Sequence, residues 1–187
     1  MPFELGGRAD KKGNRYEYNC AINEMLKLFD EINYSVVVEA LGDDEKGTDI
    51  LVTTMKGEKE HQQCKARNAS KEYWDVSGLK TKRILKTWVF QLNRDSDRKV
   101  ALVSPLVCSF LVDLHDRAIN TSGKETDFYY IQIMESSKEF QRFYQELCLG
   151  MGLNVSEGNG NEKIDRVKSI NYLKRIIVCI MGLKPSP

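Results

Sequence analysis

The chain has 187 residues, of which 41% are hydrophobic and 29% charged, and its formal net charge is +1. Such values are typical of one sizeable globular domain, or of one domain with an appendage. They exclude the strongly basic class of nucleic-acid-binding proteins that overall charge alone identifies. Charge is nevertheless uneven along the chain, since the stretch GLKTKRILK is basic and residues 39–45 are acidic.

The cysteines and the N-terminus indicate the expected compartment. The five cysteines are far apart and form no CxxC pair, which argues against a zinc cluster. Most of them lie among apolar residues, where a free thiol behaves as a small hydrophobic group, so we expect a reducing, cytoplasmic setting. Met1 is followed by no apolar signal-peptide segment, and no run of about 18 apolar residues predicts a membrane helix.

Hydrophobic spacing predicts the order α-β-β-β-α-β-α-β-α, an α/β fold with a mixed central sheet flanked by helices. In chain order the expected elements are helix 10–31, strand 34–41, strand 48–55, strand 60–67, helix 73–92, strand 99–104, helix 106–118, strand 127–134 and helix 136–149. Because strand 34–41 is β-branched and apolar, we expect it to be buried on both faces. Gly78 is an expected helix break, and Ser136 with Glu139 an expected capping box.

A change of composition at Gly150 predicts the domain organisation. Residues 1–150 form the expected domain, and the Gly- and Asn-rich residues 151–162 form the expected linker. Residues 163–187 hold an expected amphipathic helix, Lys163 to Gly182, which leads toward a further module of a longer chain. The alternative is that this helix docks back on the domain.

The most informative stretch runs from Thr48 to Arg67 and is expected to form a β-hairpin that turns near Lys56. Its second strand, EHQQCKAR, is unusually polar for a strand between apolar neighbours, and such conflicts are expected at functional sites. Gln63 and Lys65 are two apart and therefore share a face. The turn pairs position 49 with about position 64, so we expect Asp49 to lie beside both of them.

These residues offer the ligands of a hard divalent cation. The carboxylate of Asp49, the amide oxygen of Gln63 and the main-chain carbonyl of Cys64 are three oxygen ligands suited to Mg²⁺ or Mn²⁺. A metal there polarises a phosphodiester and acidifies a bound water. Lys65 beside it is a point charge that stabilises the developing negative charge. The sequence therefore predicts phosphodiester chemistry at the hairpin.

Asp49 and Gln63-Cys64-Lys65, following a helix that carries Gly13, Tyr16 and Glu17, resemble the PD-(D/E)xK family, which has the restriction-endonuclease-like fold. The stretch QCKAR with the upstream GTDILV is most similar to N-terminal effector domains of bacterial anti-phage proteins. Those proteins include antiviral STAND ATPases and the nucleases of cyclic-nucleotide-triggered defence systems. The resemblance covers roughly residues 3–150.

The resemblance implies metal-dependent cleavage of double-stranded DNA by an effector domain that homo-oligomerisation activates. Asp49 and Gln63 match the metal-binding positions, Lys65 the catalytic lysine, and Glu17 an acid that some members carry on the first helix. Two residues depart from the family pattern: Thr48 stands where members have Pro, and Gln63 replaces the second acid. Glu17 is the first candidate to supply the missing charge, and Glu39 is the second.

Six residues are candidate contacts to the DNA backbone, which cations commonly neutralise. They are Arg67, Asn68, Lys80, Lys82, Arg83 and Lys86. The alternative for the last four is an ordinary solvated helix face, and the alternative for each acid is a surface charge or an ion pair. His61 and His115 are expected to be structural or exposed, which leaves a Ser or Cys nucleophile without a base.

Two other functions fit the same residues. A module that keeps the nuclease fold without cleavage would use the basic helix for DNA binding or its C-terminal helix for oligomerisation. An Mrr-like restriction endonuclease would use the same chemistry with a different trigger.

Overall fold

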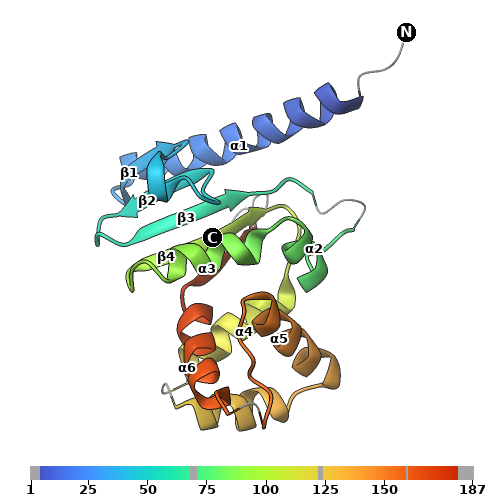
Figure 1. Ribbon diagram of the computed structural model, residues 1–187. Coiled ribbons are helices and arrows are strands. Elements are labelled where there is room, and N and C mark those ends of the chain that lie inside the picture. Colours follow the sequence, from blue (N-terminus) through green and yellow to red (C-terminus); the bar gives the residue numbers. More distant parts are fainter. Residues whose placement is uncertain (1–4, 68–70, 122–123, 159, 181–187) are drawn as a thin grey trace.

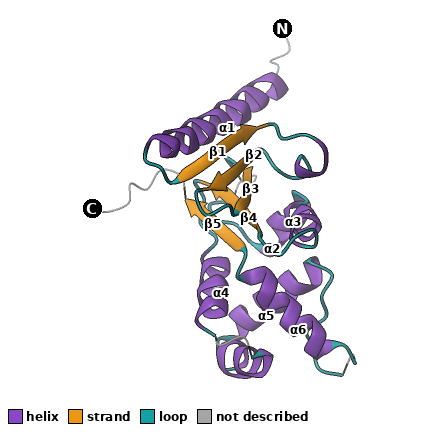
Figure 2. Cartoon of the chain, turned by 90° about the vertical axis from the view of Figure 1, so that its left-hand side faces the viewer, coloured by secondary structure: helices purple, strands orange, loops and turns teal. Residues whose placement is uncertain are grey.

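The computed structural model describes residues 5–67, 71–121, 124–158 and 160–180, with the backbone alone described for residues 5–12. It contains a five-stranded sheet in the order β1-β2-β3-β4-β5, with helices on both faces (Figures 1 and 2). The first three strands form an antiparallel meander, whereas β4 is parallel to β3 and β5 is parallel to β4. The expected α/β class, with a mixed sheet flanked by helices, is confirmed. The strands are β1 (Asn33–Val38), β2 (Ile50–Thr54), β3 (Lys59–Cys64), β4 (Arg98–Ser104) and β5 (Ile176–Ile180).

The two faces of the sheet pack against different helices. The long helix α1 (Leu5–Phe29) covers one face, where Cys20 and Ala21 contact residues of β2, β3 and β4. The other face joins the larger hydrophobic core, into which Val100 and Leu102 of β4 are directed, whereas Val103 belongs to the α1 side. The helices on that side are α2 (Val76–Thr81), α3 (Ile84–Leu92), α4 (Ser109–Asn120), α5 (Lys138–Gly150) and α6 (Glu162–Leu173).

Strand β1 differs from its prediction. It lies at the edge of the sheet and ends at Val38, so the expectation of a strand buried on both faces is wrong. Tyr34 is 72% exposed, because no strand pairs with the outer side of β1 in the described sheet. The short 3-10 helix Gly42–Asp44 and the turn after it then lead to β2. Apolar composition alone does not distinguish an edge strand from a central one.

The segment predicted as strand 127–134 is also different: Asp127–Met134 is a π-helix. Its buried residues are Phe128, Tyr129 and Ile133, a spacing that belongs to a helix and not to a strand. Arg117 of α4 donates to the carbonyl of Gln132 at 2.5 Å, which ties the segment to the helical layer. Packing between helices has thus overridden the local preference of DFYYIQIM for a strand.

The C-terminal segment corrects the prediction of one helix from Lys163 to Gly182. Helix α6 ends at Leu173, and Ile176–Ile180 forms β5, the last strand of the sheet. Side chains at 151, 153 and 155, within the predicted linker, are buried in the larger core. Helix α6 therefore ends earlier than predicted, because the β-branched run that follows it pairs with β4.

Smaller corrections concern helix ends. The helix predicted over 73–92 begins at Val76 and breaks at Arg83, which has φ 59, and not at Gly78. Ser137, and not Ser136, caps α5, because its Oγ accepts a hydrogen bond from the Phe140 amide at 3.2 Å. The helix predicted from residue 106 begins at Ser109.

Candidate functional site

Asp49 and Lys65 meet at one end of the sheet. Lys65 Nζ lies 3.1 Å from Asp49 Oδ2, and the amide of Cys64 donates to the same oxygen at 2.7 Å. Lys65 Nζ also donates to the Cys64 carbonyl at 3.0 Å. The convergence expected from the hairpin is therefore present, and both side chains are about one-quarter exposed.

The antiparallel pairing of β2 with β3 explains this meeting. Ile50 pairs with Gln62, and the amide of Asp49 donates to the Gln62 carbonyl at 2.9 Å. Asp49 therefore stands just before the start of β2, where β3 has reached its end at Cys64. The register differs by one residue from the predicted pairing of positions 49 and 64. The carboxylate of Asp49 provides an acceptor for the last amide of β3.

Two further carboxylates surround Asp49. Together with Asp49, the side chains of Glu17 on α1 and Glu39 after β1 line a pocket of about 500 Å³. The pKa of Glu17 is raised above its ordinary value, first by burial and then by the Asp49 carboxylate, while Lys65 opposes the shift. Glu39 raises the same pKa further. Both candidates for the missing charge thus lie near Asp49.

Replacing Glu17 with Gln is expected to stabilise the folded chain at pH 7. Because the pKa of Glu17 in the folded chain is raised above 4.5, its protonated carboxyl stabilises the fold relative to the unfolded chain. This contribution is fully present below pH 4.5 and is lost as pH rises through the folded-state pKa. The gain should therefore disappear below about pH 4, the range where the unfolded carboxyl is also protonated. Urea denaturation at both pH values measures it, with Glu72→Gln as an exposed control outside the pocket. Destabilisation of Glu17→Gln at pH 7 would contradict the expectation.

Gln63 is not brought to this pocket. Its side chain is buried, and its Oε1 has no hydrogen-bond partner within the described part of the chain. Gln63 pairs with Leu102, whose side chain belongs to the larger core, so it lies on the face opposite α1. Gln63 and Lys65 were predicted to lie on one face of the strand. Their polar groups nevertheless do not meet, because Lys65 lies beyond the end of β3.

The donors that remain fit a hard divalent cation in part. Among the described residues, no three His, Cys, Asp or Glu side chains form a metal-binding group. The pocket nevertheless holds the carboxylates of Asp49, Glu17 and Glu39, and after burial the negative charges of Asp49 and Glu39 add to the raised pKa of Glu17. Mg²⁺ needs only one or two carboxylates and completes its shell with water and phosphate oxygens. Asp49 and Glu17 are the pocket carboxylates suited to hold it, and the Cys64 carbonyl, which accepts from Lys65 Nζ, is the third oxygen predicted from the sequence.

The predicted DNA contacts lie on the exposed surface. Arg67 is exposed, and Asn68 lies outside the described residues. Exposed basic side chains also lie around the junction of α2 and α3, at Lys80, Lys82, Arg83 and Lys86. Because α3 leads back into β4, its first turn lies at the sheet end where β3 finishes, and Figure 1 shows α2 near the arrowhead of β3. The basic residues therefore lie at the same end of the sheet as Lys65.

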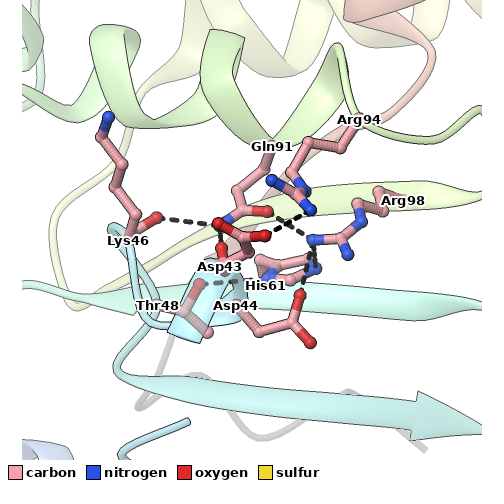
Figure 3. Close-up of polar contacts among 8 residues, drawn as sticks. All are labelled: Asp43, Asp44, Lys46, Thr48, His61, Gln91, Arg94 and Arg98. Atoms are coloured by element: carbon pink, nitrogen blue, oxygen red, sulfur yellow. Dashed lines mark hydrogen bonds and ion pairs between the residues drawn. The ribbon is translucent and has the colours of Figure 1, made fainter. Parts of the chain in front are cut away.

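A buried polar network, absent from the sequence prediction, holds the loop that precedes Asp49 (Figure 3). Gln91 of α3 donates to the carbonyls of Asp43 and Lys46, each at 3.0 Å, and its Oε1 accepts from Arg98 at 2.6 Å. Gly47, with φ 73, lies so close to α3 that an added Cβ would come within 2.3 Å of the Thr87 side chain. The loop is thus fixed against α3 immediately before it delivers Asp49 to the site.

His61 of β3 forms the centre of this network. Arg98 Nη1 lies 3.2 Å from His61 Nε2 and 2.7 Å from Asp44 Oδ1, and His61 Nδ1 lies 3.0 Å from the Thr48 hydroxyl. Because the guanidinium can only donate, His61 Nε2 accepts and Nδ1 carries the proton. Burial, followed by the charge of Arg98, lowers the pKa of His61 to about 4. In the sequence, the polar composition of the strand at residues 60–67 was the only signal of this network.

Comparison with family models, with curated proteins and with solved structures found no match. No helix in the described ranges is long and apolar enough to cross a membrane. The site is therefore interpreted from its own geometry.

Proposed function

We propose that the chain is a metal-dependent endonuclease that cleaves double-stranded DNA. The observation that carries the proposal is the ion pair of Lys65 with Asp49, 3.1 Å apart at the end of a mixed sheet. Glu17 and Glu39 line the pocket that Asp49 enters. An acid, a lysine and additional carboxylates at one partly exposed point are the groups that phosphodiester hydrolysis requires.

Each group has a distinct proposed role. Asp49, the Cys64 carbonyl and Glu17 would hold Mg²⁺, with Mn²⁺ as an alternative ion. When bound, the metal supplies Lewis-acid activation of the phosphodiester and of a water molecule. Lys65 Nζ, already held by Asp49 and the Cys64 carbonyl, stabilises the negative charge that develops on phosphate oxygens.

Substrate binding is assigned to the basic junction of α2 and α3. Its exposed cations lie at the same end of the sheet as Lys65, where they would neutralise DNA phosphates. The resemblance to effector domains of anti-phage proteins makes phage defence the proposed setting, with activity controlled by homo-oligomerisation. All five cysteines are free thiols, which supports a cytoplasmic location.

Replacing Lys65 with Met is expected to lower plasmid cleavage by at least about tenfold, because one stabilising charge is lost at the reacting phosphate. The measurement is conversion of supercoiled plasmid in Mg²⁺, with EDTA as the metal-free arm. Lys99→Met removes the same charge from the opposite end of the sheet, where Lys99 pairs with Glu58 at 2.7 Å, and should cleave normally. Equal activity of both variants, or cleavage in EDTA, would rule out the assigned site.

The position of Gln63 favours a second candidate, a nuclease-fold module that binds DNA without cleaving it. Gln63 lies on the face away from Glu17, and no three-residue metal group is found in the described ranges. This candidate predicts DNA binding that Lys82→Glu weakens, together with no cleavage in either metal. Plasmid cleavage that depends on Lys65 would exclude it.

A further inference from the structure

Helix α1 carries a second apolar face. Five of its large side chains are between 40% and 85% exposed: Tyr18, Ile22, Met25, Leu26 and Phe29. Of the residues that pack on the sheet, Cys20 lies on the opposite side of the helix and Ala21 lies on its flank. At 3.6 residues per turn, Cys20 is about half a turn and Ala21 about a quarter of a turn from the centre of the exposed set. A helix exposed on one side normally carries polar residues there, so this pattern indicates a helix covered on both sides.

The spacing of this outer face fits the packing of one helix against another. Tyr18, Ile22, Met25 and Phe29 are separated by four, three and four positions, the alternation that lines the seam of paired helices. Figures 1 and 2 show α1 on the outside of the molecule, with its far side away from the sheet. Among the described elements, none lies over that side in either view.

The area of the face fits a stable protein interface. Ile32 and Tyr34, directly after the helix, are exposed as well, at 56% and 72%. The five α1 side chains alone expose on the order of 600 Å², most of the roughly 800 Å² that each partner buries in a standard-size interface. Apolar surface of that size on a single chain marks a contact site.

The charges beside the face indicate the partner. The first half of α1 is basic in sequence, with Arg8, Lys11, Lys12 and Arg15, whereas Asp30 and Glu31 follow its last turn. An antiparallel copy centred between Ile22 and Met25 would bring Tyr18 of one chain to Phe29 of the other. It would also bring Arg15 opposite position 32, next to Asp30 and Glu31 of the second copy, while Glu17, which lines the Asp49 pocket, falls at the level of Asp30. A parallel copy would instead place Arg15 beside Arg15.

We infer that α1 pairs with α1 of a second copy of this chain in antiparallel orientation, so that the chain is a homodimer through this face. The interface is isologous, since each copy contributes the same seam and the same pair of charged ends. Tyr18 of this seam also lines the pocket of Glu17, Glu39 and Asp49, but the homodimer does not depend on whether Asp49 and Lys65 cleave DNA. Its test therefore measures association and not cleavage.

The first arm of the test is sedimentation of the chain over a range of concentrations. The wild-type chain is expected to be a dimer, and Phe29→Glu is expected to weaken association by at least about a hundredfold, because it places two charges in the apolar seam. Ile164→Glu is the matched control, since Ile164 is also an exposed apolar residue on a helix, and it should leave association unchanged. A wild-type chain that stays monomeric at about millimolar concentration overturns the inference.

The second arm identifies the partner and the orientation by charge exchange. Arg15→Glu alone and the double variant Asp30→Lys/Glu31→Lys alone should each associate at least about tenfold more weakly than wild type, because like charges then face each other. A mixture of the two should form heterodimers at wild-type affinity, since opposite charges meet at both ends. A mixture that associates no better than its components overturns the antiparallel pairing. Circular dichroism checks that each variant is folded.

Discussion

Asp49→Asn is expected to reduce DNA cleavage by at least about 100-fold, the scale of loss when one electrostatic group of an active site is removed. The amide keeps the shape of the side chain and can still accept the hydrogen bond from the Cys64 amide. It lacks the charge that binds a metal and pairs with Lys65. The measurement is plasmid cleavage at saturating Mg²⁺, followed by a Mg²⁺ titration that separates weaker metal binding from slower chemistry.

The same substitution should change stability little. The ion pair of Asp49 with Lys65 is about one-quarter exposed, and pairs in contact with solvent contribute only about 0–1 kcal/mol. Asp43→Asn is the matched control, because Asp43 is an acid of the same loop whose carboxylate pairs with Arg94 at 2.6 Å, on the α3 side. It should cleave normally. Unchanged cleavage by folded Asp49→Asn would remove the basis of the proposed function.

Arg98→Met is expected to destabilise the fold by about 3 kcal/mol, the scale of breaking a buried ion pair by removing one partner. The side chain of Arg98 is 11% exposed and contacts Asp44, Gln91 and His61. Its loss leaves these three groups without their shared donor. Urea denaturation at pH 7 measures the effect, and Arg94→Met, whose ion pair is more exposed, should lose less than about 1 kcal/mol.

The pH dependence of stability provides a second test of this network. The pKa of His61 is about 4 in the folded chain and 6.5 ordinarily, so between these values the unfolded state binds the additional proton. The stabilising contribution is thus present above pH 6.5 and is lost as pH falls toward 4, on the order of 3 kcal/mol. Removing the charge of Arg98 should make this loss shallower. An Arg98→Met slope equal to that of wild type would contradict the assigned contact.

Sequence reasoning found the meeting of Asp49 with Lys65 because both lie on one hairpin, where turn position nearly fixes the register. It failed for Gln63 because side-chain alternation holds only within a strand. Since β3 ends at Cys64, Lys65 is free to turn toward Asp49 while Gln63 stays on the α3 side.

The sequence alone did not predict the long-range contacts. The hydrogen bond of Gln91 to the Asp43 carbonyl joins residues 48 positions apart, and no local pattern indicates it. The apolar runs at 127–134 and 176–180 were assigned the wrong structure for a related reason. A short apolar run has no periodicity that distinguishes a strand from a buried helix. Packing against neighbouring elements therefore determines which of the two it forms.

The position of β5 has a consequence for how the protein is made. Its partner β4 ends at Ser104, more than seventy residues before β5 begins at Ile176. A nascent chain from which β5 has not yet emerged has an open β4 edge and an incomplete core, so the sheet that carries Asp49 and Lys65 reaches its final form only after β5 has left the ribosome. An expression fragment intended to contain the whole sheet must therefore extend through Ile180.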